Sequence, residues 1–121
     1  MIFLGLFIFI DQLAKYLVRH WGGFYICNQN ISFGMQIPAY LFYLIWIILV
    51  LTLIYFYLKQ RKLYFILILA GAISNLIDRA IFGCVIDFIN LKIWPIFNLA
   101  DIFITIGVIM LLYKIRTTDS H

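Results

Sequence analysis

The chain of 121 residues has few charged side chains and contains no glutamate. Only 12% of its residues are charged, whereas about a quarter are charged in a typical soluble domain. So few charges cannot cover a globule with polar surface, which excludes an ordinary soluble domain. Hydrophobic residues make up 66% of the chain, and the mean hydropathy is +1.08. We therefore predict an integral membrane protein with a single domain over residues 1–121.

Histidine and cysteine are also scarce, with two of each. Cys27 and Cys84 are separated by 57 positions and form no CxxC motif, so we interpret them as small buried or interfacial residues. The His and Cys cluster of a zinc site is missing, and no serine has a helical spacing from a lysine that would indicate a Ser–Lys dyad. The remaining hydrolytic option is aspartate chemistry with no metal and no organic cofactor.

Four apolar segments predict membrane-spanning helices, at about residues 2–18, 39–58, 63–81 and 99–115. The second carries no charge along its whole length and is long enough to cross the hydrocarbon core as a helix. The first could instead be a signal peptide, but it lacks a basic n-region and a small-residue cleavage site. Asp11 and Lys15 within it are spaced i,i+4, on one face of a helix, which favours a membrane helix with a polar pair.

The basic residues predict the orientation in the membrane. The cluster KQRK at 59–62 separates two clear spans, and basic residues also follow the last span. Counting all basic residues is ambiguous, but this compact cluster places both termini in the cytoplasm by the positive-inside rule. The connections at 19–38 and 82–98 then face outward. No basic patch of the nucleic-acid-binding type is present, so the net charge of +4 does not predict a nucleic-acid partner.

The two outward connections differ in composition. Residues 21–38 mix Gly, Asn and alternating apolar side chains, which predicts turns and short strands in a small sheet at the membrane surface. In the second connection, the stretch DFINLKIW at 87–94 is compatible with a short interfacial helix. The fold class predicted is thus an all-α membrane protein with four transmembrane helices and a small β-containing, outward-facing region after the first helix.

Four of the five aspartates lie in or beside apolar runs, namely Asp11, Asp78, Asp87 and Asp101. Asp87 follows the third span and Asp101 begins the fourth, and the connection between them is too short to cross the membrane and return. Both therefore belong to the outward ends of two successive helices. Two carboxylates at close range tend to share one proton, and such a pair can activate water and protonate a leaving amine.

Spacing and placement alone leave three interpretations of these acids open. They can hydrolyse peptides, conduct protons or cations, or hold helices together by pairing with Arg79, Lys15 or Lys92. Asp78 stands next to Arg79 and three positions after Asn75. We interpret Asp78 as a structural residue that binds the third helix to its neighbours through polar contacts.

Five motifs follow one another along the chain: DQLAK at 11–15, NQNISFG at 28–34, SNLIDR at 74–79, GCVIDF at 83–88 and FNLAD at 97–101. Together they resemble the motifs D-x-x-x-K, N-x-G-A-A-F, G-N-x-x-D-R, G-x-V-x-D-F and F-N-x-A-D of bacterial lipoprotein signal peptidase, also called signal peptidase II. The resemblance covers nearly the whole chain. It departs from the family at Asn30, Ile31 and Ser32, and at Ser74, where glycine is common.

The resemblance implies an aspartyl endopeptidase of the bacterial cytoplasmic (inner) membrane, with its active site on the outer side. The catalytic dyad would be Asp87 and Asp101. The matching motif positions make Asn28, Asn75, Arg79 and Asn98 supporting active-site residues, and Asp11 and Lys15 the polar pair of the first helix. The implied substrates are prolipoproteins that carry a diacylglyceryl cysteine, cleaved just before that cysteine. We expect a monomer that contacts membrane lipid.

Overall fold

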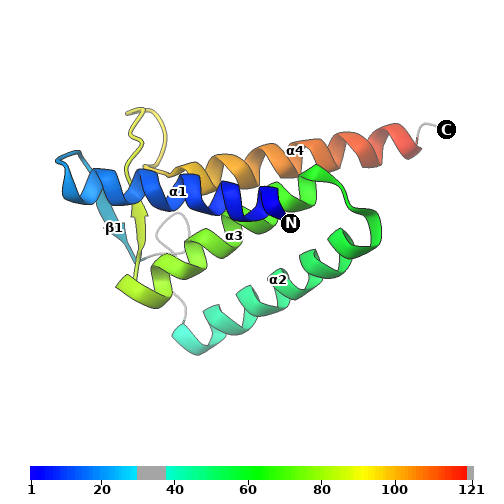
Figure 1. Cartoon of the computed structure of the whole chain (residues 1–121), viewed down its shortest axis with the longest axis horizontal. Coiled ribbons are helices and arrows are strands. Elements are labelled where there is room, and N and C mark those ends of the chain that lie inside the picture. Colours follow the sequence, from blue (N-terminus) through cyan, green and yellow to red (C-terminus); the bar gives the residue numbers. More distant parts are fainter. Residues whose placement is uncertain (30–37, 120–121) are drawn as a thin grey trace.

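The computed structural model describes residues 1–29 and 38–119. Within these residues the elements are α1 (Ile2–His20), β1 (Ile26–Asn28), α2 (Ala39–Gln60), α3 (Leu63–Phe82), β2 (Val85–Asp87) and α4 (Leu99–Asp119). The helices run alternately in opposite directions (Figure 1). The chain ends and the α2–α3 turn therefore lie away from the two strands, which gather with the connection before α4 at the opposite end.

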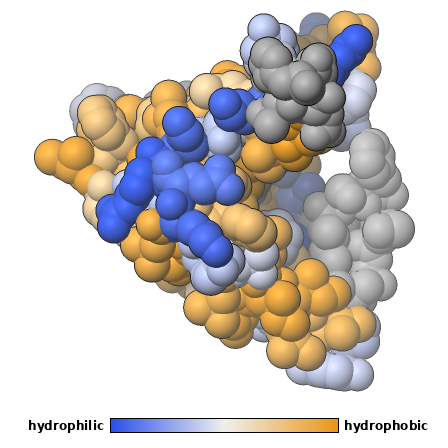
Figure 2. Space-filling model, turned by 90° about the vertical axis from the view of Figure 1, so that its right-hand side faces the viewer, coloured by the Kyte–Doolittle hydropathy of each residue, from blue (hydrophilic) through white to orange (hydrophobic). Residues whose placement is uncertain are grey.

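Two of these helices are long and apolar enough to cross a membrane, at Tyr40–Gln60 and Leu63–Phe82 in the described part of the chain. α1 and α4 have similar lengths, but each carries acidic and basic residues within its apolar run. Hydrophobic side chains cover most of the flanks in Figure 2, and hydrophilic ones gather in a cluster at the end shown. The predicted helical architecture is confirmed, and two of its four segments have the composition of a membrane span.

The third helix forms the centre of the bundle. α3 packs against α1, α2 and α4, and its contact with α4 is the most extensive. Gly71 and Gly107 make this approach possible, because a Cβ at Gly71 would collide with the backbone oxygen of Ala100. A Cβ at Gly107 would lie 2.8 Å from the backbone oxygen of Tyr64. Small residues of this kind let membrane helices approach closely.

The predicted sheet after the first helix is present, but its second strand comes from the other connection. β1 pairs antiparallel with β2, with Cys27 opposite Ile86 and Asn28 opposite Val85. The short helix expected at 87–94 is wrong, because the chain folds back there through a bridge between Ile89 and Phe97. Pro95 lacks the backbone N–H that a continuing helix would need.

The interpretation of the two cysteines as small buried or interfacial residues is correct for the buried Cys84 but misses that the two residues are paired. Cys27 and Cys84 form a disulfide, with 5.4 Å between their Cα atoms. Gly83, with φ of 73°, ends α3 in the left-handed conformation and directs Cys84 towards β1. Cys84 then lies diagonally across the ladder from Cys27, so only the pairing of two distant strands brings the sulfur atoms together.

Candidate active site

A buried cluster of charged side chains connects α1 with α3. Lys15 Nζ lies 2.6 Å from Asp11 Oδ2 and 2.7 Å from Asp78 Oδ2, and it donates a hydrogen bond to Asn75 Oδ1 at 3.1 Å. The side chains of Asp11, Lys15 and Asp78 are fully buried. An ammonium group has three N–H donors, so these three oxygens satisfy it completely. This arrangement supplies the pairing that buried charges in an apolar chain require.

The two acids of this cluster also bind backbone N–H groups next to the site. Asp78 Oδ2 accepts a hydrogen bond from Ile86 N–H at 3.1 Å, which connects α3 to β2. Asp11 Oδ1 accepts one from Ala100 N–H at 2.9 Å, in the first turn of α4. An anion at a helix N-terminus satisfies a free N–H group and interacts favourably with the helix dipole. The cluster thus positions both segments that carry the predicted dyad.

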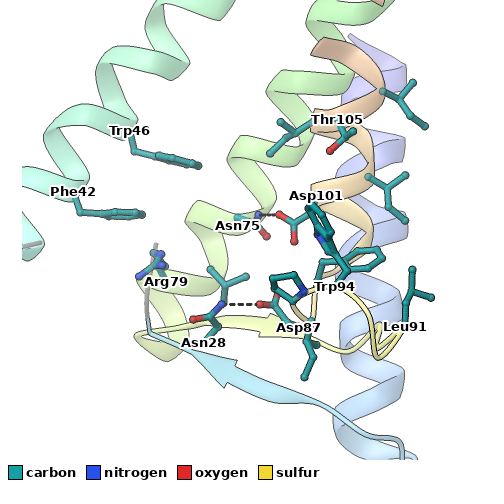
Figure 3. A pocket seen from close by; sticks show the side chains of 17 residues that line it. Asn28, Phe42, Trp46, Asn75, Arg79, Asp87, Leu91, Trp94, Asp101 and Thr105 are labelled. Carbon is teal, nitrogen blue, oxygen red and sulfur yellow. Dashed lines mark hydrogen bonds between the residues drawn. The ribbon is translucent and has the colours of Figure 1, made fainter. Parts of the chain in front are cut away.

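Asp101 lies in the first turn of α4, and Asn98 precedes that helix. The Asn98 side-chain oxygen accepts a hydrogen bond from Asp101 N–H, and Asp101 Oδ2 accepts one from Asn98 N–H, a reciprocal capping box. Asp101 Oδ1 also accepts a hydrogen bond from Asn75 Nδ2 at 3.2 Å (Figure 3). The Asp101 carboxylate is therefore fixed from both α3 and the start of α4.

Asp87 ends β2 and is 4% exposed. Its Oδ2 accepts a hydrogen bond from Asn28 Nδ2 at 3.0 Å, and its Oδ1 accepts one from Asn98 Nδ2 at 2.9 Å. Asn98 Nδ2 also donates to Asn75 Oδ1 at 3.0 Å. Asn75 and Asn98 thus connect the two acids to each other and to Lys15.

Burial raises the pKa of the Asp87 carboxyl to about 6. The hydrogen bond from Asn28 acts in the opposite direction, and the negative charge of Asp101 adds to the increase. Asp87 and Asp101 are therefore electrostatically coupled, as expected for carboxylates that titrate as a pair. A carboxyl that ionises near pH 6 can both accept and donate a proton near neutral pH.

Both acids border a cavity of about 500 Å³ between α2, α3, α4 and the connection before α4. Figure 3 shows Asp87 and Asp101 directed into it, with Phe42 and Trp46 extending from α2 on the opposite side. Most of the remaining wall is apolar, including Trp94 and Phe97. Polar reacting groups in a mostly apolar cavity are typical of an enzyme site for an apolar ligand.

Arg79 also lines the cavity, at the side near β1. Its Nη1 donates a hydrogen bond to the backbone oxygen of Gln29 at 3.3 Å, and its guanidinium carbon lies 4.3 Å from the centre of the Phe42 ring. The cation–π contact with α2 and the bond to the segment after β1 hold Arg79 beside the two acids.

The structure brings together the residues predicted from the motifs. Asn28, Asn75, Arg79, Asp87 and Asp101 all line the cavity, and Asn98 lies buried behind the acids. Asp11, Lys15 and Asp78 lie outside the cavity lining, in the charged cluster.

The sequence did not reveal that Gln12 and Ser74 belong to the charged cluster. Gln12 Nε2 donates to Asp78 Oδ1 and to Ser74 Oγ, and Ser74 Oγ donates to Asp11 Oδ2 at 2.6 Å. The departure at Ser74 thus adds a hydrogen bond to the charged cluster. Gln12 could have been predicted as a member of this cluster, because it is a polar amide next to Asp11 in an otherwise apolar run. The departures at 30–32 lie outside the described residues.

A family model described as signal peptidase (SPase) II matches residues 3–117. The chain belongs to the signal peptidase II family. The lipoprotein signal peptidase of Thermodesulfovibrio yellowstonii is 37% identical over 130 aligned positions, covering 90% of this chain and 88% of the relative. That of Caldicellulosiruptor bescii is 43% identical over 112 positions, covering 88% and 75%. The resemblance found in the five motifs is therefore confirmed.

Two solved structures support the same assignment of the fold. Both are described as bacterial membrane enzymes, with TM-scores of 0.84 and 0.81 and sequence identities of 29% and 28%. The first comparison covers 97% of this chain and 87% of the other, and the second covers 93% and 88%. As a signal peptidase II, the chain is a membrane protease of lipoprotein processing.

Proposed function

We propose that this signal peptidase II is an aspartyl endopeptidase that removes the signal peptide from prolipoproteins carrying a diacylglyceryl cysteine. Asp87 and Asp101 are the catalytic pair. The observation that carries the proposal is their common position: they come from different elements, face one cavity and share the hydrogen-bonding partner Asn98. The names of the curated relatives support the substrate class.

In the proposed reaction the dyad shares one proton and binds a water molecule between its carboxylates. The ionised carboxylate takes a proton from this water while the water oxygen attacks the scissile carbonyl carbon, and the protonated carboxyl gives its proton to the carbonyl oxygen, which gives a tetrahedral diol. The C–N bond then breaks as the leaving amine takes a proton from one dyad carboxyl and a hydroxyl group of the diol returns a proton to the other carboxylate. Two protons enter and two leave the dyad, so the enzyme returns to its starting state without a covalent intermediate.

The role assigned to Asn28, Asn75 and Asn98 is to orient the carboxylates, because each donates a hydrogen bond to at least one of the two acids. Amides are neutral donors, so they orient the carboxylates while leaving the pair able to exchange its proton. Arg79 is assigned the binding of the substrate backbone or lipid ester near the dyad. Phe42 and Trp46 form the apolar wall against which the acyl chains lie.

The proposed placement has all four helices in the bacterial cytoplasmic (inner) membrane, with both termini in the cytoplasm. The cluster at 59–62 lies at the end of the molecule away from the strands, so Asp87 and Asp101 are at the outer side. α1 and α4 span the bilayer because their charged residues are buried against α3 or lie near a helix end. The proposed active unit is a monomer, because Asp87, Asp101 and the described cavity lining all belong to one chain.

The test is incubation of the purified protein with a lipidated precursor and with the same precursor lacking the diacylglyceryl group. We expect cleavage of the lipidated precursor only, just before the modified cysteine. Asp87→Asn and Asp101→Asn should each abolish cleavage while the protein stays folded in detergent. Cleavage by either variant near the parent rate would contradict the dyad, and ion-coupled uptake without cleavage would identify a transporter instead.

Asp78→Asn is the matched control, because it removes a buried carboxylate that does not line the cavity. We expect it to lower the unfolding temperature and to retain cleavage per folded molecule. Complete loss of activity in a stable Asp78→Asn protein would contradict its structural assignment. For the orientation, a reporter fused after the last residue should be active in the cytoplasm and inactive outside it.

A further inference from the structure

The hydrogen bond from Asn28 to Asp87 depends on a strand with little support of its own. β1 has three residues, and its ladder with β2 contains three residue pairs. An isolated two-stranded ladder of this size is marginally stable. The strand is also approached through Gly22 and Gly23, which leave the backbone freedom to move. Strand pairing alone therefore does not explain why the Asn28 amide stays 3.0 Å from the carboxylate.

The disulfide acts at the point where this support is needed. Cys27 immediately precedes Asn28, and Cys84 immediately precedes the strand that ends in Asp87. Cys84 is fully buried, at the end of α3. A cross-link between residues 57 positions apart removes much of the chain entropy that would otherwise favour separation of the two strands. It therefore joins the segment carrying the donor to the segment carrying the acid.

We infer that the Cys27–Cys84 disulfide is a positioning cross-link for catalysis, which holds Asn28 against Asp87 and makes the activity depend on the oxidised state. The inference rests on the proposed aspartyl mechanism and adds a redox requirement to it. The proposed outward placement of the strands puts the disulfide in a compartment where disulfides persist. A dithiol reductant would transfer two electrons and two protons, breaking the S–S bond to two thiols and itself becoming a disulfide.

Loss of the cross-link should change how Asp87 ionises. The charged groups that face Asp87 are Asp101 from α4, Lys15 from α1, and Asp78 and Arg79 from α3. Contacts within the helix bundle hold Asp101, Lys15 and Asp78, so these three residues should keep their positions when the disulfide opens. The Asn28 amide favours the anionic form of Asp87, and its withdrawal raises the pKa of that carboxyl. A cross-link with a merely stabilising role would leave the ionisation unchanged.

The experiment measures kcat/KM for the lipidated precursor between pH 4.5 and 8 in three preparations. These are the oxidised protein, the protein reduced with dithiothreitol, and the double variant Cys27→Ala/Cys84→Ala. Thiol labelling should find no free thiol in the first preparation and two in the second. In the reduced protein and the variant we expect the alkaline limb of the profile, where the dyad loses its shared proton, to move to higher pH by about half to one unit, the size expected for one hydrogen bond to a carboxylate.

The variant lacks cysteine, so dithiothreitol should not alter its activity, which controls for other effects of the reductant. Asn28→Ala should move the alkaline limb by the same amount, and removal of the cysteines from Asn28→Ala should add no further shift. A reduced, folded protein with the profile of the oxidised protein would overturn the inference. Absence of cleavage by the oxidised protein would instead overturn the proposed function.

Discussion

Asn98 and Asp101 hold each other in place through two hydrogen bonds of opposite direction. Asp101 N–H donates to Asn98 Oδ1 at 2.9 Å, and Asn98 N–H donates to Asp101 Oδ2 at 3.1 Å. The same Asn98 side chain donates through Nδ2 to Asp87 Oδ1. One asparagine therefore begins the helix that carries one acid and orients the carboxylate of the other. Helix capping and alignment of the dyad are functions of a single side chain.

These two functions of Asn98 can be separated by substitution. Asn98→Ala removes the cap and the amide donors, so we expect a loss of about 1 kcal/mol in stability and at least about a tenfold loss in kcat/KM. Asn98→Ser retains a capping oxygen and should recover most of the stability but not the activity. Thermal unfolding in detergent and precursor cleavage measure the two effects. Full activity of Asn98→Ser would show that the amide donors are dispensable.

The pKa of Asp87 predicts that activity and stability both decrease as pH rises. Activity should fall as pH rises through about 6, because the dyad then loses the proton that its two carboxyls share. Stability follows the same order. The folded-state pKa lies above the usual 3.8, so the stabilising contribution is complete below pH 4 and is lost as pH rises through about 6.

The difference of about two units corresponds to at most about 3 kcal/mol. Thermal unfolding from pH 4 to 7 should therefore show a decrease in wild-type stability that Asp87→Asn does not share. Parallel curves for the two proteins would contradict the elevated pKa. Exposed acids contribute equally to both proteins, so the comparison cancels them.

Lys15 is expected to be essential for folding. Lys15→Met leaves Asp11 and Asp78 buried without their cation, which should cost about 3–5 kcal/mol. The matched control is Lys59→Met, which removes an exposed lysine and should change stability by about 0.5 kcal/mol or less. Yield and unfolding temperature in detergent provide the measurement. Equal stability of the two variants would argue against the pairing in the charged cluster.

Gly71 tests the close approach of α3 to α4. In Gly71→Ala the new Cβ would collide with the Ala100 backbone oxygen, so α4 must move away and carry Asp101 with it. We expect lower thermal stability and reduced kcat/KM. Gly5→Ala adds the same methyl group in α1, where it would meet no neighbouring side chain and no other element within 4 Å, and should have neither effect. Unaltered activity in Gly71→Ala would mean that the dyad tolerates displacement of α4.

The helices and the meeting of Asp87 with Asp101 could be predicted from sequence for a simple reason. A long, uncharged apolar run has one favourable conformation in a membrane, because a helix satisfies all of its backbone hydrogen bonds internally. The connection between the two acids is too short to reach the other side of the bilayer and return. Both arguments use only distances along the chain.

The parts that could not be predicted depend on pairing between distant segments. Nothing near Cys27 specifies that Ile86 will lie opposite it, so the sheet register and the disulfide were not accessible. Phe42 and Trp46 resemble every other aromatic residue of an apolar helix until the helix packing directs them into a cavity. The site residues that match family motifs could be found from the sequence, whereas the residues that form the cavity walls could not.

The unequal packing of the helices bears on two steps of the reaction, substrate entry and bond cleavage. α2 packs chiefly against α3 and is joined to it by the two residues Arg61 and Lys62, and within the described residues the hydrogen bonds to the two acids come from outside α2. An outward displacement of α2, on the microsecond-to-millisecond scale of helix motions, would widen the cavity and leave the hydrogen bonds from Asn28, Asn75 and Asn98 to the carboxylates intact. Substrate entry would then depend on one helix and bond cleavage on the others, so a change of lipid composition that alters entry need not alter cleavage.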